Sequence, residues 1–90
     1  MRSPIRQNNR VFIRGDQRHW IGIVHDSDEL QIVLESPTWM TYIPKLNDTL
    51  EKGVQAEDKY DVLPKETFLV IPWSKVQDAC DWKHELPKAR

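Results

Sequence analysis

The residues of this sequence with the clearest capacity for binding chemistry are its four tryptophans, Trp20, Trp39, Trp73 and Trp82. Indole rings fill protein cores, but they are also favoured at interfaces and stack on nucleic-acid bases. We expect at least two of them in the core. The local alternation points Trp20 away from Ile21 and Ile23, which predicts an exposed anchor there. Trp39, which follows a proline turn signal, is the second expected anchor.

Arginine recurs at every fourth position near the start of the chain, as Arg2, Arg6, Arg10, Arg14 and Arg18. Pro4, Gly15 and the alternating apolar residues argue against one helix through this stretch. On a strand, Arg10 and Arg14 share the outward face. They would either protect an edge strand from unwanted pairing or bind phosphate groups. The acidic residues of the neighbouring hairpin favour the first interpretation, and they would equally suit arginines of another subunit.

Catalytic and metal-binding patterns are weak. Asp26, Asp28 and Glu29 lack the longer frame with a distal glutamate that a calcium loop needs. The three histidines and the single cysteine show no spacing typical of zinc ligands. Nothing around Cys80 matches a cysteine hydrolase, and the three separated glycines form no phosphate-binding loop. We therefore expect no catalytic, metal-binding or cofactor-binding residues, and a protein that is not an enzyme.

The composition describes a small globular protein. Ninety residues, of which 39% are hydrophobic and 30% charged, predict a single domain over 1–90. A net charge of -1 argues against a generally basic nucleic-acid binder. One cysteine cannot form an internal disulfide, no stretch is long and apolar enough to span a bilayer, and the N-terminus lacks the apolar core of a signal peptide. These features predict a cytoplasmic protein that does not contact a membrane.

Short strands separated by turns are predicted to position these side chains. The apolar alternation marks strands over 10–14, 19–24 and 30–35, with turns at 15–17 and 25–29. Ser36-Pro37 breaks the pattern, and 38–44 follows as a separate extended piece. The continuous apolar run over 67–73 predicts a strand that is buried on both faces. Turn signals at this close spacing favour a small barrel.

Three segments are less regular. Residues 1–9 are polar and are predicted to form a flexible arm. Residues 45–65 have scattered apolar positions and predict a long inserted loop, with a short helix over 47–52. This loop is expected to be the most mobile part of the fold. Residues 74–86 fit a helix from Ser74, a strand from Val76, or a single helical turn over 73–76 followed by a short strand.

The stretch VFIRGDQRHWIGIVHDSDELQIVLES resembles the first motif of Sm-like proteins. In that motif a turn around a glycine, a strand with a second glycine and a turn with an aspartate match Gly15, Gly22 and Asp28. A polar residue and a run that ends in Leu-Glu then match Gln31 and 34–35. The resemblance places Gln31 where the family has the asparagine of its RNA-binding loop.

The late run TFLVIPWSKV takes the place of the second Sm-like motif and looks more like the divergent bacterial members. The resemblance covers about half of the chain. It implies a mainly β, small five-stranded open barrel that assembles into rings and binds single-stranded RNA. Other small barrels that end in an Ile-Pro-Trp strand, such as the PRC-barrel type, fit this run nearly as well.

Two hypotheses about function follow, and both describe a binding module. In the first, a homo-oligomeric Sm-like barrel binds single-stranded RNA, or a partner, through Arg10, Arg14, Trp20, Asp28, Gln31 and Trp39. In the second, the protein is an interaction or scaffolding domain without a nucleic-acid role, and its tryptophans and long loop contact a partner protein. The resemblance favours the first hypothesis, whereas the near-neutral charge favours the second.

Overall fold

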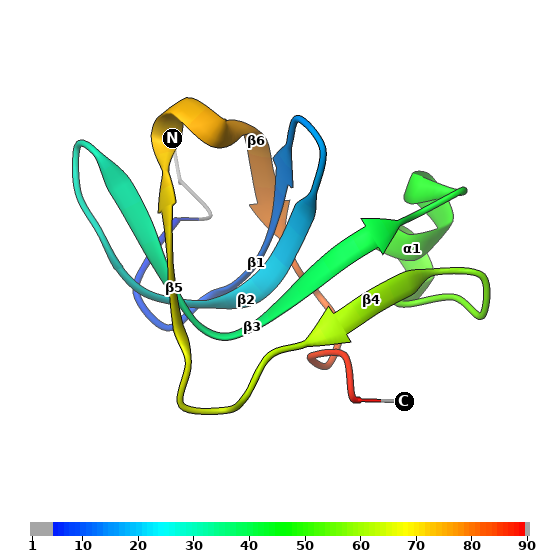
Figure 1. Cartoon of the computed structure of the whole chain (residues 1–90). Helices are drawn as coiled ribbons and strands as arrows, with labels where there is room; N and C mark the ends of the chain where they lie inside the picture. The colour runs from blue at the N-terminus through cyan, green and yellow to red at the C-terminus, as the bar shows by residue number, and fades with distance from the viewer. Residues whose placement is uncertain (1–4, 90) are drawn as a thin grey trace.

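The computed structural model describes residues 5–89, which form a mainly β structure (Figure 1). In chain order the elements are β1 (Arg10–Gly15), β2 (His19–Ser27), β3 (Gln31–Tyr42), α1 (Leu46–Lys52), β4 (Lys59–Val62), β5 (Phe68–Pro72), the 3₁₀ helix η1 (Trp73–Lys75) and β6 (Val76–Asp81). The prediction of a mainly β protein with short strands is confirmed. Within the described residues, α1 is far too short to cross a bilayer, and no other helix could do so.

The strands form one antiparallel, unclosed sheet of six strands in the order β4-β3-β2-β1-β6, with β5 paired to β3 off this path. The first half of β3 pairs with β5, and its second half pairs with β4. The last strand, β6, returns to the first, β1. In Figure 1, β1, β2, β3, β5 and β6 curve around one space, while β4 and α1 extend away from it. The predicted strand count of five is therefore wrong by one: β4 was not expected, while the pieces predicted over 30–35 and 38–44 form the single strand β3.

β3 is one continuous strand, so the predicted break at Ser36-Pro37 is wrong. Ser36 adopts φ 50°, and the β2–β3 register shifts between Ile21 and Ile23, so the irregularity is absorbed as a bulge beside Gly22. A Cβ at Gly22 would lie only 3.2 Å from the Glu35 carbonyl oxygen. Pro37 falls between the residues that pair with β5 and those that pair with β4, where the missing N–H costs no ladder bond.

The sheet is covered on both faces. The first core contains Val11, Ile13, Val24, Ile32, Leu34 and Ile71. The second core contains Phe12, Ile21, Met40 and Trp82. Phe12 lies opposite Val11 and Ile13, as alternation predicts, but it is buried rather than outward. On the side of the second core, Phe12 is covered by the C-terminal segment, where the Phe12 and Trp82 rings stack with centroids 6.1 Å apart.

The segment 45–65, predicted as a long loop, contains α1 and β4. The predicted helix over 47–52 is confirmed, with one residue more at its start. The buried Asp58 carboxylate ties the connection together: its Oδ2 accepts the Thr49 hydroxyl at 2.7 Å and the Gln55 backbone N–H at 2.8 Å. β4 then pairs with β3. A segment with these contacts is an element of the fold rather than an inserted loop.

Both ends of the described chain pack on the sheet. Residues 1–4 of the predicted arm lie outside the described residues, whereas Ile5 packs on the first core and the Asn8 N–H donates to the Val24 carbonyl at 2.8 Å. After β5 the chain makes one 3₁₀ turn and continues as β6 from Val76, so of the three alternatives for 74–86 the helical turn followed by a strand is confirmed. The helix from Ser74 is wrong.

Candidate functional site

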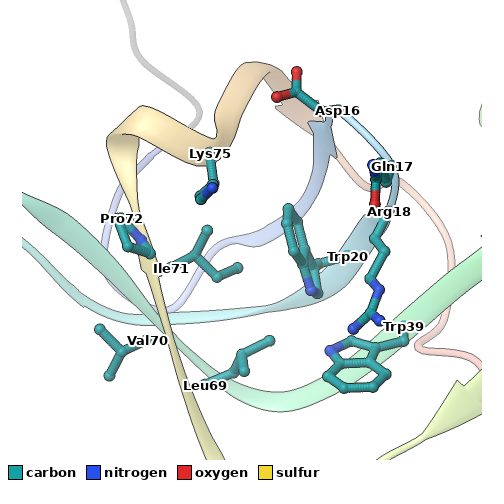
Figure 2. A pocket seen from close by; sticks show the side chains of 10 residues that line it. All are labelled: Asp16, Gln17, Arg18, Trp20, Trp39, Leu69, Val70, Ile71, Pro72 and Lys75. Atoms are coloured by element: carbon teal, nitrogen blue, oxygen red, sulfur yellow. The ribbon is translucent and has the colours of Figure 1, made fainter.

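Trp20 and Trp39, the two expected anchors, lie directly opposite each other on β2 and β3. Residues that pair across antiparallel strands project from the same face of a sheet. Both indoles line a hollow of about 370 Å³ (Figure 2). Its lining residues are Asp16, Gln17, Arg18, Trp20, Trp39, Leu69, Val70, Ile71, Pro72 and Lys75, and we call this site the tryptophan hollow.

Trp20 is largely buried, so the expectation of a freely exposed ring is corrected. Its indole packs against the first core. The alternation was misleading here because Ile21 faces the second core, which leaves Trp20 on the side of the first one. Trp20 thus joins the core to the hollow: part of the ring is fixed by packing, and the rest forms the wall that a ligand would meet.

The β1–β2 turn sets the position of the aromatic wall. The Gly15 N–H donates to the Arg18 carbonyl at 2.9 Å, which closes the turn. A Cβ at Gly15 would lie 2.7 Å from Trp20 Cζ3 and 2.8 Å from the Arg18 oxygen, closer than real Cβ contacts. Only glycine fits at this point, because the turn and the indole approach each other so closely.

Arg18 leans over the second indole. Its guanidinium carbon lies 4.6 Å from the centroid of the Trp39 ring, in a cation–π contact that Figure 2 shows from the side. The Trp39 Nε1–H is buried and has no hydrogen-bond partner among the described residues. An unsatisfied buried donor is unfavourable, and a ligand oxygen is the kind of group that would satisfy it.

The rim of the tryptophan hollow is positively charged. Among the ion pairs that link described residues, none involves Arg18 or Lys75. Asp16 is the carboxylate on the rim, and its Oδ1 accepts a hydrogen bond from Gln77 Nε2 at 2.8 Å. The rim has one arginine and one lysine but only one carboxylate, so it carries an excess of positive charge.

The opposite wall is formed by β5, which pairs only with β3 in the described sheet. The Trp73 N–H donates to the Leu30 carbonyl at 3.0 Å, and hydrogen bonding alternates along an antiparallel pair. Ile71 and Leu69 therefore bond to β3, whereas the backbone N–H and C=O of Val70 point away from it. This free edge borders the hollow (Figure 2).

The remaining predicted site residues lie elsewhere. Arg14 forms a two-pronged ion pair with Asp78 of β6, with Nε 3.1 Å from Oδ1. Arg10 is exposed at the start of β1, and its carbonyl accepts the Trp82 N–H. These arginines do not line the tryptophan hollow, and Arg14 is already neutralised.

Asp28 and Gln31 have structural partners in the β2–β3 turn. Asp28 Oδ1 accepts the backbone N–H groups of Leu30 at 2.8 Å and Gln31 at 3.0 Å. The Asp28 carbonyl accepts Trp73 Nε1–H at 2.6 Å, which ties the turn to η1. These contacts close a turn over 28–30, so the predicted turn at 25–29 is wrong in its first three residues, which continue β2. The predicted set is thus divided, since only Trp20 and Trp39 meet at one site.

Among the described residues, the pKa values of Cys80 and His19 are shifted. Partial burial raises the pKa of the Cys80 thiol, and Asp78 and Asp81 add to the effect, so the thiol is protonated at neutral pH. Burial and then the Arg14 charge lower the pKa of His19. Neither group lines the tryptophan hollow. Within residues 5–89, no cluster of three or more histidine, cysteine or acidic side chains is arranged to hold a metal ion.

Sequence reasoning missed Arg18, Lys75 and the β5 wall. A usable signal was present for Arg18, which lies two residues before Trp20 in the first turn. Lys75 carried no such signal, because it reaches the hollow only through the return of the chain from β5 to β6. No protein-family model, curated protein or solved structure matches this chain. Its function is therefore inferred from the geometry of the described residues.

Proposed function

We propose that this protein is a non-enzymatic binding module whose tryptophan hollow binds an extended segment of a partner protein. The observation that supports this most is the pair of indoles, Trp20 and Trp39, beside the free edge of β5. Tryptophans in a partly desolvated hollow are typical energetic centres of protein interfaces. Leu69, Ile71 and Pro72 complete an apolar lining that suits an aliphatic or aromatic side chain.

The binding mode that fits this site is strand addition. A segment laid along β5 would pair with the N–H and C=O of Val70, and alternate side chains would enter the hollow. Backbone pairing supplies affinity, while the indoles select the side chain. Phe68 and Val70, with 54% and 50% of their surface exposed, give the same edge an apolar outer face.

Selection from a random dodecapeptide display library against the purified protein tests this function. We expect clones whose synthetic peptides bind the wild type and lose at least about 30-fold in affinity on Trp39→Ala, as at an interface hot spot. Tyr42→Ala is the matched control, since Tyr42 is an aromatic residue of the same strand, 55% exposed and outside the hollow. If no peptide distinguishes the wild type from Trp39→Ala, the proposed function is wrong.

We also propose that the curved part of the sheet is an Sm-like barrel and that the cytoplasmic protein is a homo-oligomer. The order of β1, β2, β3, β5 and β6 supports the likeness, as does the short 3₁₀ turn between the last two strands. The unpaired edges of β5 and β6 in the described sheet support self-association, because exposed edges pair readily. In this proposal α1 and β4 are additions to the barrel.

Single-stranded RNA is the second candidate ligand. Arg18 and Lys75 beside two indoles combine positive charge with stacking surfaces, as single-strand binders do. Fluorescence anisotropy with a labelled mixed-sequence RNA at low salt tests it: Trp39→Ala should weaken binding, and Lys75→Gln should reduce the salt dependence. If the RNA does not bind at protein concentrations up to about 50 µM, this candidate is excluded and the peptide-binding module remains.

A further inference from the structure

We infer that the segment bound in the tryptophan hollow is acidic, with a carboxylate side chain next to the apolar one that enters between the indoles. This inference rests on the proposed function and names the chemistry of the partner. It is based on the charge of the rim, on the contact between Arg18 and Trp39, and on the unpartnered indole donor.

The two cations of the rim lie on different elements and leave the hollow between them. Arg18 comes from the β1–β2 turn and Lys75 from η1, and Figure 2 shows them on opposite sides of Trp20. Neither belongs to an ion pair among the described residues. Asp16 is held by Gln77 at the edge of the site. A carboxylate that entered the hollow would therefore meet two cations without displacing an existing partner.

The position of Arg18 suits carboxylate recognition. Its guanidinium face covers the Trp39 ring, and a guanidinium that stacks on an aromatic face keeps its N–H groups free in its own plane. These N–H groups match both oxygens of a carboxylate. An acidic side chain can thus bind Arg18 while the cation–π contact persists, so binding does not require that contact to be lost.

Trp39 offers a further donor in the same place. Its Nε1–H is buried without a partner among the described residues. A second oxygen of the ligand, from a carboxylate or a backbone carbonyl, would satisfy this donor where it enters beside Arg18. An acidic segment can pair with Arg18 and Lys75 and can also accept a hydrogen bond from the Trp39 indole. A basic segment would instead be repelled by the two cations.

The modest size of the charge favours an acidic peptide over nucleic acid. The rim carries Arg18 and Lys75 against Asp16, which suits one or two carboxylates. A nucleic acid presents a phosphate at each nucleotide, and its backbone would continue past the rim.

The test uses fluorescein-labelled dodecapeptides from the display selection, synthesised with Glu, Gln or Lys at their charged positions. We expect enrichment of peptides with Asp or Glu beside an aromatic or aliphatic residue. The Glu form should bind the wild-type protein about tenfold more tightly than the Gln form. The preference should disappear in the double variant Arg18→Gln, Lys75→Gln. It should persist in Lys59→Gln, Lys65→Gln, which removes two exposed lysines outside the hollow.

The outcomes separate this inference from the proposed function. Selected peptides that need Trp39 but bind equally well in the Glu and Gln forms, or best in the Lys form, would overturn the acidic partner and leave the binding module intact. Absence of any peptide that depends on Trp39 would overturn both. RNA binding that is lost in the double variant, without peptide binding, would assign the two cations to phosphate recognition instead.

Discussion

At the residue scale, Gly15 is the position where backbone and binding site depend on each other most directly. A methyl group there would collide with the Trp20 ring and with the Arg18 carbonyl. We expect Gly15→Ala to lower the free energy of unfolding by about 1–3 kcal/mol, as for other overpacked sites. Urea denaturation measures this loss. Gln17→Ala, an exposed residue of the same turn, is the control, and equal stability of the two variants would contradict the close approach.

His19 predicts a specific dependence of stability on pH. Because burial and Arg14 lower its pKa in the folded protein, the unfolded chain binds a proton more readily. The contribution of His19 is fully present above its ordinary pKa of about 6.5 and is lost as the pH falls through the lower, folded value. The loss of unfolding free energy between about pH 7.5 and about pH 5.5 should therefore be smaller in His19→Gln.

Chemical denaturation at both pH values checks this expectation. His25→Gln is the control, because the exposed His25 lies only 3.7 Å from Glu35, in a solvated pair, and its ring contacts Phe68 at the surface. A pH dependence in His19→Gln identical to that of the wild type would show that His19 does not contribute. A smaller pH dependence of stability in His25→Gln alone would contradict the prediction, because the effect would then come from His25 and not from His19.

At the element scale, Asp58 decides whether the segment between β3 and β5 behaves as structure or as loop. Its carboxylate accepts hydrogen bonds from Thr49 and Gln55 in a buried position. Asp58→Ala should lower the unfolding free energy by about 1–3 kcal/mol, the cost of unsatisfied buried donors. Trypsin should then cut at Lys52 or Lys59 early, while the wild type is protected there. Asp61→Ala on the exposed side of β4 is the control, and early cleavage of the wild type would restore the original loop interpretation.

The elements that alternation describes well were predictable from the sequence. Val11, Ile13, Ile32 and Leu34 lie in the first core as the period-two pattern indicates, because a strand with one buried face records that face in its sequence. The prediction that the run over 67–73 is buried on both faces is wrong, since Phe68 and Val70 are exposed at the edge of the sheet. β4 was missed because it has only four residues. The connection before it is held by Asp58, a polar residue whose burial no hydropathy pattern shows.

The site was predictable in its parts and not in its assembly. Trp20 and Trp39 were expected as separate anchors, but their pairing depends on the β2–β3 register, and that register is shifted by the bulge near Gly22. Arg14 was expected either to protect an edge strand or to bind phosphate, and it pairs instead with Asp78, a residue 64 positions away on the strand that covers β1. Contacts between residues so far apart in sequence depend on the assembly of the whole sheet, which local patterns do not encode.

At the scale of the whole molecule, the free edge of β5 predicts competition between assembly and ligand binding. We expect multi-angle light scattering to give a homo-oligomer at micromolar and higher concentrations. Val70→Lys should shift it toward the monomer, because a charge on an edge strand opposes pairing. Val62→Lys on β4 is the control. A monomer at all concentrations would remove the Sm-like ring. If β5 pairs in the oligomer, a bound peptide should also dissociate it.

The pairing of β1 with β6 has a consequence for synthesis on the ribosome. β1 lies between β2 and β6, and Phe12 packs on Trp82, so the first strand stays half paired until the last one has been made. Contacts between residues so distant in sequence form late and slow the folding of β proteins. The nascent chain must therefore emerge past Ile71 before the first core can close, and past Trp82 before the second core can close. Until then it exposes Val11, Phe12 and Ile13 to aggregation or to chaperones.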